Sequence, residues 1–247
     1  MKKTPRIALI TGSARRLGRE IALSAAESGY DIVLNYNSSS VKTVNKTITE
    51  IESRGANAYP FKADISKVKD VIRMFDFIRK KINRLDLLVN NSAIFEKKDF
   101  FDIDESFFNE FIDTNLKSVF FCSQEAAKIM KKQKKNRNNI INIASLGGLL
   151  NWQDFMPYSI AKAGVIKFTE LLAKKMSPDI LVNAIAPGTI IIPGDANRTA
   201  NLDEVKNYPI GRFGVPADIN SLIKYLIVEN TYITGHTFVV DGGRMLR

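Results

Sequence analysis

The chain has 247 residues, of which 45% are hydrophobic and 25% charged, a balance typical of globular proteins. This length is enough to bury a large core, as one α/β domain or as two small ones. The formal net charge of +10 brings acidic partners and nucleic acid into consideration. No apolar run approaches the ~20 residues of a transmembrane helix, so we expect no membrane association.

The chain contains one cysteine, Cys122, and one histidine, His236. A single cysteine cannot form an intramolecular disulfide, which suits a reducing compartment, so we expect a cytoplasmic protein. Cys122 follows three apolar residues, and we interpret it as a packed thiol and not as a nucleophile. One His and one Cys cannot build a standard zinc site or a Ser–His–Asp triad. We therefore predict no metal centre.

A basic run at residues 128–137 holds five lysines and one arginine. It has two interpretations: a solvated helix end whose cations complement the helix dipole, or a docking surface for an acidic partner. No aromatic residue interleaves the run, which argues against single-stranded nucleic acid. We expect no nucleic-acid binding.

Short apolar runs alternate along the chain with segments of helical periodicity. The predicted strands are residues 7–11, 32–36, 58–61, 85–90, 140–144, 181–185 and 238–240. Regular alternation predicts a parallel sheet covered by helices on both faces. No Pro/Gly/Ser-rich linker divides the chain, so we predict one domain over residues 1–247. In such sheets, ligands bind at the carboxyl ends of the strands.

The first predicted strand ends in Thr11-Gly12 and leads through residues 13–18 into a helix. A glycine turn before a helix N-terminus is an anion site, because free backbone N–H groups and the helix dipole both favour phosphate. Gly12 permits a tight turn, and Gly18 permits close contact between helix and strand. The absence of a Gly-Lys-Ser/Thr sequence argues against a nucleoside-triphosphate loop. We predict that a dinucleotide binds here.

The residues around this loop favour NADP(H). Arg15 and Arg16 could hold an additional phosphate in a bidentate manner. The second strand leads into Tyr36-Asn37-Ser38, whereas an NAD site typically has an acid there that binds the ribose 2′-hydroxyl. The missing acid and the two arginines together favour the 2′-phosphate.

The fifth strand leads to Ser145, and a helical segment containing Tyr158 and Lys162 follows. Four-residue spacing places Tyr158 and Lys162 on one helix face, one turn apart. An ammonium group beside a phenol stabilises the phenolate and makes a tyrosine usable as an acid or base near neutral pH. Ser145 could donate a hydrogen bond to a substrate oxygen.

From Ile7 to the last strand, the chain resembles the short-chain dehydrogenase/reductase family. The matching residues, in chain order, are Thr11-Gly12, Gly18, Asp64, Asn90-Asn91, Asn115, Ser145, Tyr158, Lys162, Pro187-Gly188, residues 211–216 and Asp241-Gly242-Gly243. The resemblance implies an α/β fold, a Rossmann-type doubly wound sheet of seven parallel strands in three α/β/α layers. It also implies an NADP(H)-dependent oxidoreductase that assembles as a homotetramer.

The resemblance assigns roles to individual residues. Tyr158 would donate a proton to the carbonyl, Lys162 would bind the nicotinamide ribose, and Ser145 would position the substrate oxygen. Asn115 would hold a water in a proton relay and Asp64 would contact adenine, although Asn115 could simply pair with backbone groups and Asp64 could cap a helix. The expected cofactor contacts are Gly12, Ser13, Arg15, Arg16, Leu17, Gly18, Tyr36, Asn37, Ser38, Asp64, Ile65, Asn91, Ser92, Ala93, Tyr158, Lys162, Pro187, Gly188 and Ile190.

Three positions depart from the family pattern. Arg16 replaces the middle glycine of the phosphate loop, Ser92-Ala93 replaces Ala-Gly, and Ile192 replaces a threonine that would bind the nicotinamide amide. The arginine pair and the Pro193 ending resemble the pteridine reductases of the family, whereas Ser145 with Asn115 resembles the 3-oxoacyl-(acyl-carrier-protein) reductases. Acyl carrier proteins are acidic, so the basic run could serve as their docking surface.

The substrate therefore has two candidates. The first is a 3-oxoacyl thioester whose carbonyl is reduced, and the second is a dihydropteridine whose C=N bond is reduced. Phe95, Trp152 and Phe155 could sandwich a flat ring, line an acyl channel or simply pack in the core. A third hypothesis is a non-catalytic NADP-binding regulator. Residues 193–207 are polar and weakly periodic, and we predict a mobile lid there.

Overall fold

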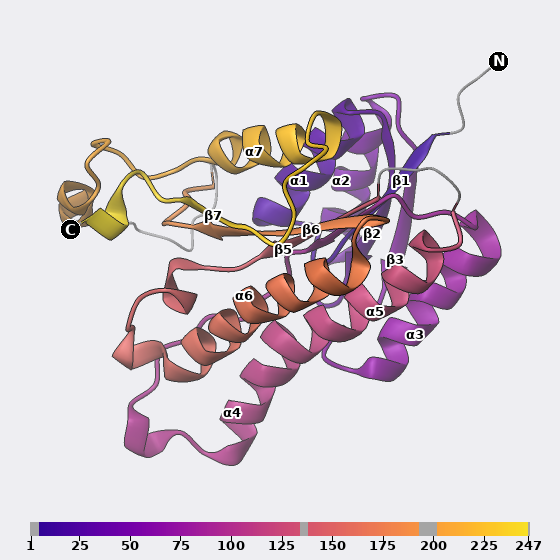
Figure 1. Ribbon diagram of the computed structural model, residues 1–247. Helices are drawn as coiled ribbons and strands as arrows, with labels where there is room; N and C mark the ends of the chain where they lie inside the picture. Colours follow the sequence, from indigo (N-terminus) through magenta and orange to yellow (C-terminus); the bar gives the residue numbers. More distant parts are fainter. Residues whose placement is uncertain (1–4, 134–137, 193–201, 247) are drawn as a thin grey trace.

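The computed structural model describes residues 5–133, 138–192 and 202–246 (Figure 1). Seven strands form one sheet in the order β3-β2-β1-β4-β5-β6-β7, and every neighbouring pair is parallel. The strands are β1 (Arg6–Ile10), β2 (Tyr30–Tyr36), β3 (Ala58–Lys62), β4 (Leu87–Asn90), β5 (Asn138–Ile143), β6 (Ile180–Pro187) and β7 (Thr237–Val240). The predicted fold class is confirmed.

Helices connect successive strands. They are α1 (Arg16–Glu27), α2 (Val41–Glu52), α3 (Val68–Phe77), α4 (Glu105–Ile112), α5 (Ser118–Met130), α6 (Met156–Met176) and α7 (Pro216–Val228). Two π-helical turns, η1 (Ile78–Ile82) and η3 (Asp113–Lys117), join them, as do the 3-10 turns η2 (Phe100–Asp102), η4 (Leu146–Gly148), η5 (Gln153–Phe155), η6 (Leu202–Asn207) and η7 (Arg244–Leu246). Within the described ranges, no helix has both the length and the apolar character to cross a membrane.

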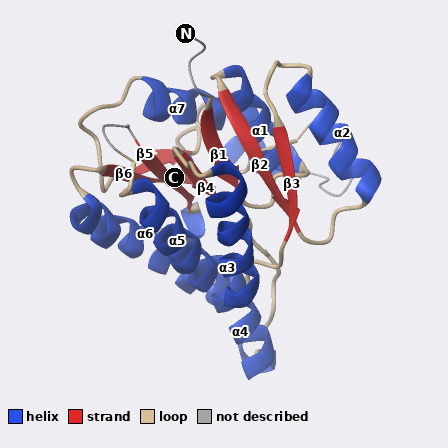
Figure 2. Ribbon diagram, turned by 90° about the vertical axis from the view of Figure 1, so that its right-hand side faces the viewer, coloured by secondary structure: helices blue, strands red, loops and turns tan. Residues whose placement is uncertain are grey.

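The sheet separates two hydrophobic cores (Figure 2). Along β1, Ala8 and Ile10 face the core beneath α1, α2 and α7, whereas Ile7 and Leu9 face the core beneath α3, α5 and α6. This alternation follows from the two-residue period of a strand. Because both faces are covered, the strand is apolar at every position, which explains the continuous apolar runs of the sequence.

The strand order reverses between β1 and β4. From β1 the chain moves outward to β2 and β3, then returns past β1 to β4 and continues in the opposite direction. The loops that follow β1 and β4 therefore diverge and leave a cleft. Thr11 links the two sides, because its Oγ1 accepts the backbone N–H groups of Asn91 (2.9 Å) and Ser92 (3.0 Å). This contact fixes the position at which the site opens.

Close packing also brings α6 against the loop after β5. A Cβ on Gly147 would lie 2.7 Å from Cε3 of Trp152, and one on Gly148 would lie 2.7 Å from the carbonyl carbon of Lys162. Only glycine therefore allows this approach without displacement. The loop and the helix together carry the residues that the sequence analysis placed at the catalytic centre.

Candidate active site

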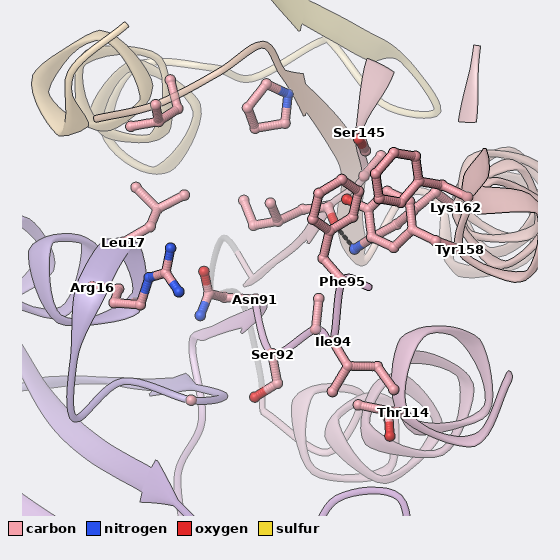
Figure 3. A pocket seen from close by; sticks show the side chains of 18 of the residues that line it. Arg16, Leu17, Asn91, Ser92, Ile94, Phe95, Thr114, Ser145, Tyr158 and Lys162 are labelled. Carbon is pink, nitrogen blue, oxygen red and sulfur yellow. Dashed lines mark hydrogen bonds between the residues drawn. The ribbon is translucent and has the colours of Figure 1, made fainter. Parts of the chain in front are cut away.

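The loops after β1 to β6 border one cavity of about 1390 Å³. Pockets that hold a single small ligand typically measure about 300–1,000 Å³, so this cavity has room for a dinucleotide and a second ligand. Figure 3 shows Arg16 and Leu17 on one side of it and Ser145, Tyr158 and Lys162 on the other. The residues from the two ends of the predicted site are therefore brought together.

The glycine turn after β1 has the geometry that an anion site needs. Gly12 has a φ of 64°, in the left-handed region that glycine adopts readily. A Cβ on Gly18 would lie 2.3 Å from the carbonyl oxygen of Gly12, so this position excludes a side chain. No side chain caps the N-terminus of α1, which leaves its first N–H groups open to a ligand. These features fit the phosphates of a dinucleotide.

Arg16, the first residue of α1, has a φ of 54°. A residue with a Cβ in this region costs about 1–2 kcal/mol, which explains why the family has a glycine at this point. In Figure 3 the guanidinium points toward Asn91 across the cavity wall. Arg15 is exposed and also borders the cavity.

The loops after β2 and β3 form the neighbouring wall. Asn35, the penultimate residue of β2, is buried: its Oδ1 accepts the N–H of Gly12 (3.2 Å) and its Nδ2 donates to the carbonyl of Ala63 (3.2 Å). The expected cofactor contacts Tyr36, Asn37 and Ser38 border the cavity beyond it. This pairing joins the carboxyl ends of three strands.

Asp64 lies in the same wall and accepts hydrogen bonds from Oγ (2.7 Å) and N–H (3.1 Å) of Ser66. Burial raises the pKa of Asp64, but the bonds from Ser66 and the nearby Lys67 ammonium outweigh it, so the pKa lies below its usual value. Its carboxylate therefore organises the turn before α3, and a contact with adenine stays a prediction. Ile65 borders the cavity beside it.

The Lys162 ammonium is buried under the loop after β5. Its Nζ donates to the carbonyl of Ile143 over 2.7 Å, the dashed line in Figure 3. Burial disfavours the charged form and lowers the pKa of Lys162 from 10.5 to about 8. The Nζ lies 5.8 Å from the ring centroid of Tyr158. A cation thus stands behind the phenol ring, as the helical spacing predicted.

Ser145 and Tyr158 border the cavity in front of Lys162. Ser145 directly follows Ala144, at the end of β5, and its Oγ accepts the backbone N–H of Gly147 over 3.1 Å. The hydroxyl hydrogen of Ser145 is thereby left to donate elsewhere. Tyr158 is 9% exposed, so its ring is packed while part of it still reaches the cavity.

Asn115 lies behind the cavity in the π-helical turn η3 and does not border it. Its Oδ1 accepts the N–H of Ile94 (2.9 Å), and its Nδ2 donates to the carbonyl of Ile94 (3.0 Å). The side-chain amide therefore holds the loop after β4 in place. A water relay through Asn115 would use its backbone groups, and π-helical turns often present such groups at functional sites.

Three aromatic side chains and Tyr158 form one cluster at the cavity wall. Phe95 and Phe155 stack with centroids 4.4 Å apart and an interplanar angle of 6°. The Phe95 ring also meets the Tyr158 ring edge-on at 4.8 Å, and Trp152 lies parallel to Tyr158 at 6.5 Å. Because Phe95 and Phe155 already contact each other face to face, no flat ring fits between these two. They form an apolar wall beside the phenol.

All of the expected cofactor residues except Ser13 border the cavity. Ser13 is buried, its N–H donates to the carbonyl of Asn35 (2.9 Å) and its Oγ donates to that of Ile10 (2.8 Å). It supports the turn from behind. Ile192, at the threonine position of the family, packs against the core that underlies α1 and also borders the cavity.

The described part of the basic run lies away from the cavity. Lys128 pairs with Glu125, and Lys131 and Lys132 are exposed at the end of α5. Since α5 runs antiparallel to the strands, its C-terminus lies at the amino ends of the strands, opposite the site. This placement favours the solvated helix end over a carrier-docking surface. Lys134, Lys135 and Arg137 lie outside the described residues.

The predicted lid falls partly outside the described residues, which omit 193–201. Residues 202–207 form the 3-10 turn η6, and Glu204 and Asn207 border the cavity. Motion of this segment stays a prediction.

Sequence reasoning missed several residues at the site. Tyr208 is buried and its hydroxyl donates to Oγ1 of Thr189 (2.8 Å), which ties η6 to the loop after β6. Arg244, near the C-terminus, borders the same cavity. Neither lies in a periodic segment or in a recognised motif, so the sequence carried no local signal for them.

A family model described as enoyl-(acyl carrier protein) reductase matches residues 12–244. The chain is 35% identical over 247 residues to a 3-oxoacyl-(acyl-carrier-protein) reductase of Synechocystis sp., with 98% of each chain covered. It is also 35% identical over 245 residues to such a reductase of Staphylococcus aureus, again with 98% of each chain covered. The chain belongs to the short-chain dehydrogenase/reductase family.

Solved structures agree with this assignment. The acetoin dehydrogenase of Enterobacter cloacae has a TM-score of 0.89 and 30% identity, covering 98% of this chain and 97% of that one. The acetoin dehydrogenase of Salmonella typhimurium has a TM-score of 0.90 and 29% identity, with the same coverage of 98% and 97%. The resemblance inferred from the motifs is confirmed. This short-chain dehydrogenase/reductase is an oxidoreductase of a family that uses nicotinamide cofactors.

The buried ammonium makes stability depend on pH. The folded chain releases the Lys162 proton near pH 8 and the unfolded chain near 10.5, so between these values the unfolded state binds more protons and the free energy of unfolding rises with pH. Relative to Lys162→Met, the natural chain should gain up to roughly 1.4 kcal/mol per pH unit in this window. Urea unfolding of both proteins at several pH values measures the difference.

Lys167→Met, which removes an exposed lysine further along α6, is the matched control and should show no such trend. A difference between the natural chain and Lys162→Met that stays flat from neutral to alkaline pH would contradict a depressed pKa.

Proposed function

We propose that this short-chain dehydrogenase/reductase reduces a carbonyl to an alcohol with NADPH, and that a 3-oxoacyl thioester is the first candidate substrate. The observation that supports it most directly is the pair of Tyr158 and the buried Lys162 ammonium. Both lie at the end of the cavity opposite the glycine turn. A bound nicotinamide cofactor supplies the hydride, and the protein supplies the proton and the orientation.

In this proposal, three side chains promote proton transfer to the carbonyl oxygen. Tyr158 donates its hydroxyl proton to the carbonyl oxygen as the hydride reaches the carbonyl carbon, which leaves an alcohol and a tyrosinate. Lys162, charged at neutral pH behind the ring, stabilises that tyrosinate. Ser145 donates its free hydrogen to the same carbonyl oxygen and holds it near Tyr158. Asn115 keeps the loop at Ile94 in position.

The proposed preference for NADP(H) rests on the wall beyond β2. Residues 36–40, at and directly after the end of β2, include no Asp or Glu, and the Asn35 amide is committed to Gly12 and Ala63. An NAD site needs an acid at this point for the ribose hydroxyls. Arg15 is exposed and borders the same cavity as Tyr36, Asn37 and Ser38, and a guanidinium suits a 2′-phosphate.

Arg15→Ala tests this preference. Loss of a charge-assisted contact to the 2′-phosphate should raise the KM for NADPH about tenfold and leave the KM for NADH unchanged. Lys224→Ala removes an exposed cation on α7, outside the cavity, and should change neither value. An equal rise in the KM values for NADPH and NADH in Arg15→Ala would mean that Arg15 contacts a part of the dinucleotide that both cofactors share.

A thioester ketone suits the apolar wall of Phe95, Trp152 and Phe155 beside Tyr158. Curated relatives that cover 98% of this chain carry the name 3-oxoacyl-(acyl-carrier-protein) reductase, which favours a carrier-linked acyl substrate over other carbonyl compounds. A dihydropteridine is the second candidate. It is favoured by Arg16, which keeps a left-handed backbone in order to place a guanidinium in the cavity wall, and by the half-exposed Phe95 ring.

We also propose one domain over residues 1–247 that acts in the cytoplasm as a homotetramer. Cys122 is a free, buried thiol, which suits a reducing compartment. Phe120, Ile160 and Leu171 are exposed on α5 and α6, and Tyr232 is exposed beside the edge strand β7. Exposed apolar side chains at two separate places suit the two kinds of two-fold contact in a tetramer. Light scattering should give four times the chain mass, and a monomer would contradict the assembly.

The substrate assay decides between the candidates. NADPH oxidation is followed with acetoacetyl thioester and with dihydrobiopterin under the same conditions, and we expect turnover of the thioester. Turnover of dihydrobiopterin alone would replace the first candidate with the second. Turnover of neither, with NADPH still bound, would leave the non-catalytic regulator, which the intact Ser145, Tyr158 and Lys162 set argues against.

The same assay tests the proton donor. Tyr158→Phe should lower kcat by at least about 100-fold, since general-acid catalysis contributes roughly 10²–10⁴-fold, while the Kd for NADPH stays unchanged. Tyr225→Phe, an exposed phenol on α7, is the control. Activity that persists in Tyr158→Phe would assign the proton donor to another group.

A further inference from the structure

Arg244 is a cation at the cavity that no step of the proposed reaction uses. It opens the 3-10 turn η7, just after Asp241-Gly242-Gly243, and it is half-buried. It borders the cavity together with Glu204 and Tyr208. Its backbone follows β7, which lies two strands from β5 in the sheet and hence about 10 Å to the side of the catalytic strand. Arg244 therefore belongs to the substrate side, at some distance from the carbonyl.

The backbone around Arg244 is held firmly. Asp241 accepts the N–H groups of Gly243 (2.9 Å) and Met245 (2.8 Å), one residue to either side of Arg244. Gly242 has a φ of 63° and Gly243 a φ of 84°, so the turn depends on glycine. The backbone of Arg244 is thus fixed by this turn, which restricts the positions that its guanidinium can reach.

The turn is also pressed against the cavity wall. A Cβ on Gly242 would lie 2.7 Å from Ile210, and one on Gly243 would lie 2.9 Å from Pro209. The carbonyl of Gly242 accepts the N–H of Ile210 over 3.2 Å. Pro209 and Ile210 follow Tyr208, whose hydroxyl is tied to Thr189. Arg244 is therefore fixed relative to the loops that enclose the substrate.

Within the described residues, the lack of an ion pair distinguishes Arg244 from Lys97 and Arg212. Lys97 pairs with Asp154 at 2.7 Å, and Arg212 makes two bonds to Asp218 of 2.7 and 2.9 Å. Across residues 5–133, 138–192 and 202–246, no carboxylate comes within 4.0 Å of the Arg244 guanidinium, and Glu204 is no exception although it borders the same cavity. A half-buried guanidinium without a counter-ion offers its planar set of N–H donors to an anionic ligand.

We propose that Arg244 binds an anionic group of the substrate that is remote from the reacting carbonyl, in the first instance the phosphate of a phosphopantetheine thioester. This assignment rests on the proposed function. A pantetheine arm separates its phosphate from the thioester by many bonds, which suits a cation about two strand spacings from β5. A dihydropteridine that carries an attached carboxylate would offer the same guanidinium an anionic group too. Arg244 is thus a specificity-determining residue and takes no part in proton transfer.

The test compares a thioester that has the phosphate with one that lacks it. Acetoacetyl-CoA carries phosphate and the attached nucleotide on its pantetheine arm, and acetoacetyl-pantetheine carries neither. For Arg244→Gln we expect the KM for acetoacetyl-CoA to rise roughly 10- to 100-fold, with kcat unchanged, because a charge-assisted hydrogen bond is lost. The KM for acetoacetyl-pantetheine should stay as in the natural enzyme, and Arg244→Lys should recover part of the loss.

Arg212→Gln is the matched control, since it also removes one positive charge but from an exposed, ion-paired arginine that does not border the cavity. It should leave both KM values unchanged. A KM for acetoacetyl-CoA that is unchanged in Arg244→Gln, or a rise that is equal for the two thioesters, overturns the proposal. A lower unfolding temperature for Arg244→Gln together with a fall in kcat for both thioesters would assign Arg244 a structural role and also overturn it.

Failure of the proposed function is distinguished from failure of the Arg244 proposal by assays of the natural enzyme, without any variant. If that enzyme reduces dihydropteridines and not thioesters, the same variants are compared on dihydrofolate, which carries carboxylates, and on dihydrobiopterin, which carries none. A KM effect confined to dihydrofolate would then keep Arg244 as the anion site with a carboxylate as its ligand, and no difference would overturn it. If nothing turns over, calorimetric Kd values for the two thioesters with NADPH-saturated protein give the same comparison.

Discussion

The parallel direction of all seven strands, with the reversal of strand order between β1 and β4, is the constraint on which the site depends. It collects the loops after β1 to β6 at one edge and sends every helix back toward the opposite edge. Thr11 holds the two diverging sides together through Asn91 and Ser92. The same constraint explains why the lysines at the end of α5 lie far from the cavity, although their number first suggested a docking surface. Strand direction, more than charge, decides which residues can act together.

The buried Lys162 ammonium is a costly feature that this arrangement supports. Its charge is disfavoured by burial, and the carbonyl of Ile143 is the described group that it contacts by hydrogen bond. Gly148 permits this burial, since any Cβ there would press on the Lys162 backbone. The ammonium stays charged at neutral pH because its pKa is still about 8. In the proposed reaction, a negative charge on Tyr158 would relieve the same cost, so the electrostatic penalty of the resting state would favour proton transfer.

The sequence predicted the backbone of the site and not its side-chain pairing. Seven apolar runs located the strands, because strands buried on both faces are apolar throughout. Gly12 and Gly18 were interpreted correctly, since glycine geometry is a local property. Ser13 and Asn115 lie outside the cavity lining and pair with backbone groups of other segments, the Ser13 N–H with Asn35 and the Asn115 amide with Ile94. No periodicity encodes pairing between segments that meet only after folding, and for the same reason Arg244 gave no signal.

The two halves of the cavity are formed by different kinds of contact. The backbone around the proposed dinucleotide half is tightly constrained, whereas the proposed substrate half is lined by side chains. The proposed dinucleotide half depends on close backbone packing at Gly12 and Gly18, where an added carbon would collide, and on the buried Asn35 amide, whose loss would leave the groups it pairs with without a partner. The proposed substrate half is lined by side chains such as Phe95, which lies in the loop after β4 and in no strand. Arg16 belongs to both, because its left-handed backbone costs about 1–2 kcal/mol that a glycine would avoid. The side chain that carries this cost places its guanidinium in the cavity wall, so the phosphate loop is a candidate for part of the proposed substrate or cofactor selection.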